Sequence, residues 1–169
     1  MKKIFILNGS GGVGKDTFVY CVKDYVIRIK GKYVEHISSV SEVKKKAKQL
    51  GWDGEKDEKG RTLLQYVGTD IIGTKRPGYW VMFIVDLLRL FENEWDYVII
   101  PDCRYPIEYE TMRNNFDTTL IRVERPYFDN GLTEAQKNHP SEVAMDNYAF
   151  EYIIENKWDM GILKNKVKR

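Results

Sequence analysis

The 169-residue sequence predicts a three-layer α/β/α fold, in which a parallel five-stranded sheet lies between helices. Three observations support this prediction. Short apolar runs alternate along the chain with stretches of helical periodicity. A glycine-rich turn joins the first apolar run directly to a helix. Charged residues follow the later runs, where parallel strands would end at one edge of the sheet.

The first apolar run, residues 4–7, has the composition of a strand buried on both faces. Apolar residues then recur at helical spacing through 17–29. Glycines in the turn between them let backbone N–H groups point inward, and the N-terminus of the helix adds unpaired N–H groups. This strand–loop–helix arrangement predicts a binding loop for the phosphates of a nucleoside triphosphate. The expected binding residues are Gly9, Gly11, Gly12, Val13, Gly14, Lys15, Asp16 and Thr17.

Lys15 supplies a mobile cation that can reach the β- and γ-phosphates, so we assign it a catalytic role. The next position is Asp16, where phosphate loops commonly have a serine or threonine whose hydroxyl binds Mg²⁺. Thr17 is therefore the expected metal-side hydroxyl. Asp16 either holds a metal-bound water or only stabilises the N-terminus of the helix through its negative charge.

The stretch after the first helix is expected to contain a strand over 33–38 and helices over 42–50 and 61–72. The lysine run at 44–46 is either a solvated helix face or a basic rim that attracts an anionic substrate. The apolar stretch 80–91 is too short to cross a membrane and is expected to be a core helix. We expect 41–94 to form a helical substrate-binding insertion within a single domain over 1–169.

A second landmark is the strand predicted over 97–100, which ends at Pro101 and Asp102. In phosphate-loop enzymes a carboxylate at this end of a buried strand commonly holds Mg²⁺, so we assign Asp102 to the metal. The alternative role for Asp102 is to cap the helix predicted over 107–114. Arg104 lies at the same edge and is a second candidate catalytic cation.

A strand over 118–124 is followed by 125–141, which has turn formers and little periodicity. We expect this segment to be a lid that excludes water and brings in Arg125 as a third catalytic cation. Ser141 is expected to cap a short helix after it. The rest of the chain predicts a strand over 150–154 and a helix over 160–167.

Composition limits the function classes. The 27 lysine and arginine residues against 25 acidic residues give a formal net charge of +2, which argues against broad nucleic-acid binding. Two cysteines without a pairing pattern, and a first strand without a signal sequence, predict a cytoplasmic protein with no membrane partner. Two histidines are too few for a histidine-based metal site.

The loop at 9–17 reads G-x-x-G-x-G-K-D-T and resembles the G-K-D-T loop of phage-type deoxynucleoside monophosphate kinases. The segments 61–69, 102–106 and 122–126 are similar to that family's substrate-binding helices, Asp-x-Arg segment and lid border. The resemblance implies a P-loop NTPase fold, ATP and Mg²⁺ as cofactors, and phosphorylation of a (deoxy)nucleoside monophosphate to the diphosphate. The acceptor-binding residues that it implies are Arg61, Gln65, Arg76, Trp80 and Arg104.

Two other functions stay open at this point. Phosphomevalonate kinases of animals have a similar G-K-D loop, so the acceptor could be another small phosphorylated molecule. A nucleotide-binding module or ATPase without an acceptor would also use this loop, although the short chain leaves little room for coupled domains. The expected partners are small-molecule nucleotides, and a homodimer is left open.

Overall fold

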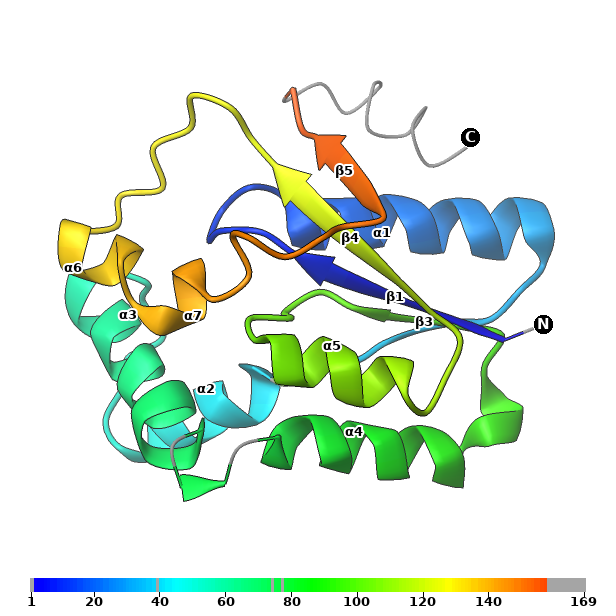
Figure 1. The fold of residues 1–169 in the computed structure, drawn as a ribbon, viewed down its shortest axis with the longest axis horizontal. Coiled ribbons are helices and arrows are strands. Elements are labelled where there is room, and N and C mark those ends of the chain that lie inside the picture. The colour runs from blue at the N-terminus through cyan, green and yellow to red at the C-terminus, as the bar shows by residue number, and fades with distance from the viewer. Residues whose placement is uncertain (1, 39, 74, 77, 158–169) are drawn as a thin grey trace.

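The computed structural model describes residues 2–38, 40–73, 75–76 and 78–157 (Figure 1). It contains a five-stranded sheet in the order β2-β3-β1-β4-β5, and every neighbouring pair of strands is parallel. This confirms the parallel five-stranded sheet. The strands are β1 (Lys3–Asn8), β2 (Val34–His36), β3 (Tyr97–Ile100), β4 (Thr118–Glu124) and β5 (Tyr152–Glu155).

Helices cover both faces of the sheet, as the sequence predicts (Figure 1). On one face lies α1 (Lys15–Tyr25), which continues as a π-helical stretch over Val26–Lys30. On the other face lie α4 (Tyr79–Leu90), which a short 3₁₀ helix at Glu92–Glu94 follows, and α5 (Pro106–Arg113). The fold is therefore three layers, helix–sheet–helix.

Both faces of β1 are apolar because the strand is central. Ile4 and Ile6 point into one core, and Leu7 points into the core on the opposite face, where it meets Phe18 and Val19 of α1. All five side chains are buried. Since successive side chains of a strand alternate between faces, an unbroken apolar run is what a doubly covered strand requires.

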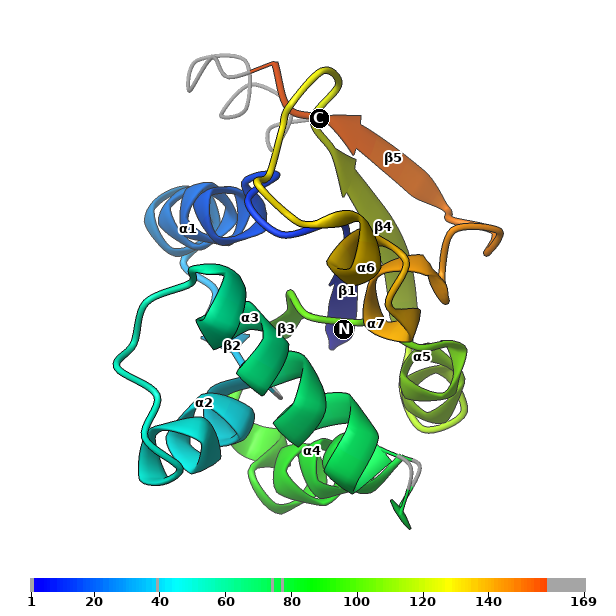
Figure 2. The same cartoon turned by 90° about the vertical axis from the view of Figure 1, so that its left-hand side faces the viewer.

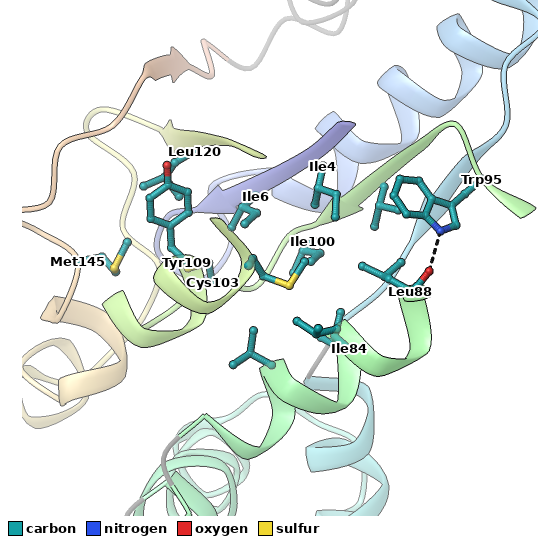
Figure 3. Close-up of a cluster of buried hydrophobic side chains, with 14 residues drawn as sticks. Ile4, Ile6, Ile84, Leu88, Trp95, Ile100, Cys103, Tyr109, Leu120 and Met145 are labelled. Atoms are coloured by element: carbon teal, nitrogen blue, oxygen red, sulfur yellow. Dashed lines mark hydrogen bonds between the residues drawn. The ribbon is translucent and has the colours of Figure 1, made fainter. Parts of the chain in front are cut away.

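Figure 3 shows the larger core, in which Ile4, Ile6 and Ile100 of the sheet face Ile84 and Leu88 of α4. Trp95 closes one end of this core, and its indole N–H donates to the Leu88 carbonyl at 3.3 Å. The core fixes β1 and β3 side by side, with Ile6 opposite Ile100. Their carboxyl ends, where the candidate site residues begin, are thereby held together.

The remaining helices gather at the carboxyl ends of the strands (Figure 2). They are α2 (Val40–Gln49), α3 (Glu58–Gln65) with a π-helical continuation over Tyr66–Gly73, α6 (Glu134–Lys137) and α7 (Pro140–Val143). The two short helices α6 and α7 belong to the predicted lid segment, residues 125–141, and its immediate end. In both ribbon views α6 lies beside α3.

Several element boundaries differ from those predicted, and two helices start at side-chain caps other than those expected. Helix α3 begins at Glu58 rather than 61, because the Asp57 carboxylate accepts the Gly60 N–H at 2.7 Å. The cap of α7 is His139 rather than Ser141: the ring Nδ1 accepts the Ser141 N–H at 3.2 Å. The helix predicted over 160–167 lies outside the described residues.

The structure also bears on the alternative role for Asp102, which was to cap the helix that is now α5. The carboxylate that caps this helix belongs to Glu108, which accepts the N–H groups of Arg104 at 2.6 Å and Tyr105 at 3.0 Å. Asp102 is therefore not needed as the cap. In the part of the chain that the structure describes, no helix combines the length and the apolar character that crossing a membrane requires.

Candidate functional site

A cavity of about 450 Å³ opens at the carboxyl ends of β1 and β3. Its walls come from the glycine-rich turn, from α2 and α3, from the segment after β3, and from the end of the lid segment. Most of the predicted site residues line it: Gly11, Gly12, Gly14, Lys15, Asp16, Thr17, Arg61, Gln65, Trp80, Asp102 and Arg104. Residues from four separate stretches of sequence thus meet at one place.

The glycine-rich turn is held tightly by the strands beside it. Gly9 has a φ of +144°, and a Cβ there would lie 2.3 Å from the Val123 carbonyl oxygen of β4. Gly14 has a φ of +101°, and a Cβ there would lie 2.4 Å from Nδ2 of Asn156. Asn156, directly after β5, donates from Nδ2 to the carbonyl of Val13 at 2.8 Å. The turn therefore has a fixed shape that depends on glycine at two positions.

Lys15 is buried and its ammonium lies inside the turn. Its Nζ donates to the carbonyls of Gly9 at 2.6 Å and Ser10 at 2.9 Å. Burial lowers the pKa of Lys15 to about 8, and the positive charge of Arg104 adds to this lowering. The carboxylates of Asp102, Glu142 and Asp16 act in the opposite direction. The protein without ligand therefore disfavours the charged form of Lys15, and this residue lines the cavity.

Oxygen ligands suited to Mg²⁺ lie in the same cavity. Thr17 and Asp16 begin α1, and Asp102 lies beyond the end of β3, where Ser38 donates its hydroxyl to Oδ2. Among the described residues no three acidic, histidine or cysteine side chains form a metal cluster. This donor set fits Mg²⁺ at a nucleotide site, because the metal is commonly held there by one or two carboxylates, substrate phosphates and waters.

Arg104 is anchored on both its backbone and its side chain. Its Nη1 donates to Oε1 of Glu142 at 3.0 Å and to the Ser141 carbonyl at 3.4 Å. Burial raises the pKa of Glu108, whose carboxylate accepts the Arg104 N–H. Sequence reasoning missed Glu142 and Glu108 as parts of the site. The spacing of Glu108 at the third position of a helix was a capping signal, whereas the role of Glu142 depends on tertiary contact.

Two residues of α3 that were predicted to bind the acceptor, Arg61 and Gln65, connect this helix to the lid segment. Arg61 donates from Nε to the Lys56 carbonyl at 2.8 Å and from Nη2 to the Asn130 carbonyl at 3.2 Å. Gln65 donates from Nε2 to the Gln136 carbonyl at 3.4 Å.

Gln136 completes this contact from the lid side. Its buried side chain donates to the Glu58 carbonyl at 3.0 Å and to the Thr62 hydroxyl at 3.1 Å. The lid segment therefore lies against α3 (Figure 2). Two of its residues, Leu132 and Ser141, line the cavity.

Trp80 brings a buried hydrogen-bond donor to the cavity wall. Among the described residues, no acceptor reaches its indole Nε1. Arg76, also predicted to bind the acceptor, is exposed, and it is not among the described residues that line the cavity.

Arg125 lies beside the glycine-rich turn instead of lining the cavity. Its guanidinium carbon is 3.9 Å from the centre of the Phe128 ring, a cation–π geometry. The Phe128 ring in turn packs on the turn, because a Cβ at Gly12 would lie 2.9 Å from the ring edge. Arg125 therefore lies near the turn through Phe128.

A family model described as deoxynucleotide monophosphate kinase matches residues 13–167. Over 110 residues the chain is 31% identical to a deoxynucleotide monophosphate kinase of Enterobacteria phage T4. That match covers 64% of this chain and 43% of the phage protein, so the chain spans less than half the length of this curated relative.

Solved structures share the fold at much lower identity. An unliganded sugar kinase from Janibacter sp. HTCC2649 has a TM-score of 0.58 and 8% identity, covering 98% of this chain and 91% of that chain. The APS kinase CysC of Mycobacterium tuberculosis, in complex with AMPPNP and APS, has a TM-score of 0.56 and 10% identity, covering 99% and 95%. At these identities the likeness shows the fold alone.

Proposed function

Because this chain belongs to the deoxynucleotide monophosphate kinase family, we propose that it transfers the γ-phosphoryl group of ATP to a deoxynucleoside monophosphate. The products are ADP and the deoxynucleoside diphosphate. The observation that supports this best is that one cavity brings Lys15 and the glycine-rich turn together with Arg104 and the side chains of α3. Phosphates from two substrates can meet there.

On the ATP side, the turn's backbone N–H groups and the N-terminus of α1 bind the phosphates. Lys15 exchanges the carbonyls of Gly9 and Ser10 for the β- and γ-phosphate oxygens. Thr17, Asp16 and Asp102 would hold Mg²⁺, which offsets phosphate charge when bound. Asp102 also keeps its contact with the Ser38 hydroxyl, which orients its carboxylate toward the cavity edge.

On the acceptor side, Arg104 provides a cation near Lys15, and Arg61, Gln65 and Trp80 line the remaining wall. An acceptor phosphate is already an anion, so the reaction needs positioning and charge stabilisation more than a strong base. The lid segment, held to α3 through Gln136, excludes water that would otherwise hydrolyse ATP. We further propose that Arg125, the first residue of the lid segment, supplies a third cation to the transferred phosphoryl group.

The test is ADP formation from ATP and Mg²⁺ across the common nucleoside monophosphates, each with and without the 2′-hydroxyl. We expect ADP to form only when a deoxynucleoside monophosphate is present. Turnover without any acceptor would indicate an ATPase module instead. Activity on a non-nucleotide phosphate alone would select the phosphomevalonate-type alternative.

The pKa of Lys15 predicts that ATP binding takes up a proton at alkaline pH. In the free protein this pKa is about 8, and triphosphate charge raises it, so the bound form stays protonated. Affinity should therefore weaken as pH rises above 8, by up to about tenfold per pH unit. Calorimetry of a non-hydrolysable ATP analogue, in buffers with different ionisation enthalpies, should show more proton uptake at pH 9 than at pH 7.

Two results decide the pH prediction. The Lys15→Arg variant, whose side chain stays charged throughout this range, should lose the uptake if it binds the analogue. Equal uptake at pH 7 and pH 9 in the wild type would contradict the assignment of a lowered pKa to Lys15.

Replacing Trp80 by phenylalanine should raise KM for the acceptor about 5- to 10-fold while kcat changes little, because a buried donor that pairs with the acceptor is worth about 1–1.5 kcal/mol. The expected partner of Nε1 is an acceptor atom of the nucleoside, since Nε1 has no hydrogen-bond partner in the described part of the chain. Steady-state kinetics separate the two parameters.

Trp52→Phe is the matched control for Trp80→Phe. The Trp52 indole already donates to the Glu55 carbonyl at 2.7 Å, and Trp52 is not among the described residues of the cavity wall. We expect an unchanged acceptor KM in this control. Equal KM values in both variants would remove Trp80 from the acceptor pocket.

A further inference from the structure

Glu142 forms a largely buried ion pair with Arg104 at the wall of the cavity. Oε1 of Glu142 lies 3.0 Å from Nη1 of Arg104, and the two side chains are only 12% and 22% exposed. The lid segment contains a second ion pair, between Glu134 and Lys137 at 2.9 Å, whose glutamate is 83% exposed. A glutamate that pairs with a basic side chain therefore occurs once in solvent, with a lysine, and once at the candidate site, with an arginine.

The contacts of Arg104 leave one edge of its guanidinium available. In the described part of the chain, the hydrogen bonds of this side chain all leave from Nη1, toward Glu142 and the Ser141 carbonyl. The guanidinium is planar and rigid, so fixing Nη1 also fixes the directions of Nε and Nη2. Arg104 lines the same cavity as Lys15, and its charge contributes to lowering the pKa of Lys15, so the guanidinium lies near the predicted phosphate site.

Glu142 itself is held in place but incompletely paired. The His139 ring accepts the Ser141 N–H at 3.2 Å and lies 2.8 Å from the Ser141 hydroxyl, which fixes the start of α7. Oε2 of Glu142 is buried, and within residues 2–38, 40–73, 75–76 and 78–157 no hydrogen-bond donor reaches it. Buried polar atoms without partners are rare in native proteins and often mark functional sites.

We propose that Glu142 is a positioning residue for phosphoryl transfer. It holds Arg104 at Nη1 so that Nε and Nη2 face the phosphates that Lys15 also contacts. Because Glu142 follows directly on the lid segment, Arg104 takes this orientation only when that segment lies against the cavity. The inference rests on the proposed kinase function, and it assigns to Glu142 a role that acts through another residue.

The experiment compares Glu142→Gln with the wild type, in the full chain and with saturating ATP and acceptor. The glutamine keeps the shape and one oxygen but removes the charge that fixes Arg104. We expect kcat to fall at least about tenfold and both KM values to change less than about threefold, since arginine contacts matter most as charge moves during transfer. Glu134→Gln, the exposed counterpart, should keep kcat within about twofold.

A double-mutant cycle separates positioning from a structural role. In an Arg104→Ala background, adding Glu142→Gln should change kcat by less than about twofold, because the residue through which Glu142 acts is gone. The melting temperatures of the variants show whether each one is folded. Multiplicative effects in the cycle, or a kcat of Glu142→Gln within twofold of the wild type, would overturn the inference.

Failure of the kinase proposal can be told apart from failure of this inference. A wild-type chain that forms no acceptor-dependent ADP would overturn the kinase proposal alone. The inference then rests on binding of ADP with aluminium fluoride, which mimics the transferring phosphoryl group. The measured quantity is the ratio of the ADP affinity with aluminium fluoride to the ADP affinity without it. This ratio should be at least about fivefold smaller in Glu142→Gln than in the wild type, and an equal ratio would overturn the inference.

Discussion

Replacing Lys15 by alanine is expected to lower kcat by about 10²–10³-fold, the loss typical of removing a group that stabilises developing charge. The ammonium lies inside the turn, where it donates to the carbonyls of Gly9 and Ser10 at 2.6 and 2.9 Å. Fold stability should change little, because burial already disfavours the charged form and lowers its pKa to about 8. We therefore expect this variant to lose activity while keeping nearly the stability of the wild type.

Steady-state ADP formation and thermal unfolding measure these two properties. Lys23→Ala on the same helix is the control, since Lys23 is not among the described residues of the cavity wall. We expect the control to retain wild-type kcat. Activity of Lys15→Ala within threefold of the wild type would show that this lysine does not contact the transferred phosphate.

Replacing Gly14 by alanine should destabilise the protein by about 2–5 kcal/mol, from left-handed backbone strain plus the loss of a buried hydrogen bond. The strain follows from a φ of +101°. The lost bond follows from the 2.4 Å approach of the new Cβ to Nδ2 of Asn156, which now donates to the Val13 carbonyl. Because Lys15 is the next residue, nucleotide binding should weaken as well.

Gly54→Ala is the matched control for Gly14→Ala. Gly54 has nearly the same φ, +106°, but nothing lies within 4 Å of a Cβ there. This variant should cost only the strain, about 1–2 kcal/mol, and should leave nucleotide affinity unchanged. Urea unfolding and calorimetric titration measure both quantities. Equal losses of stability at the two positions would show that the contact with Asn156 does not matter.

The fold could be predicted from local signals because β1, β3 and β4 are apolar runs with distinct ends. The strand predicted over 118–124 has the same bounds as β4, and the glycine-rich turn follows β1 directly. An apolar run of this kind can be assigned as a strand from its own residues, without knowing which segments pack against it. The order of the strands in the sheet required the structure, although all five were expected to be parallel.

Contacts between distant segments could not be predicted. The buried bond from Asn156 to Val13 joins residues 143 positions apart, and Gln136 reaches α3 across more than 70 positions. The pairing of Glu142 with Arg104 is of the same kind. No periodicity or capping pattern in one segment indicates which residue of another segment will meet it. Sequence therefore predicted a phosphate site, most of whose residues line one cavity, but not the contacts between distant segments that hold its cations.

Arg125 illustrates the same limit. Its place at the start of the lid segment predicts a cation for the transferred phosphate, and that role remains a prediction. The structure adds that the guanidinium lies over Phe128, against the flank of the turn. Phe128 carries no sequence signal for this contact, because an aromatic residue in a polar segment is usually only a surface residue.

A crystal structure with a non-hydrolysable ATP analogue, Mg²⁺ and a deoxynucleoside monophosphate tests the central claim most directly. The account predicts the β-phosphate inside the turn at 9–14, and Lys15 Nζ moved from the Gly9 and Ser10 carbonyls onto phosphate oxygens. The acceptor phosphate should lie beside Arg104. A nucleotide bound elsewhere, or a Lys15 that keeps both carbonyl contacts beside a bound triphosphate, would contradict it.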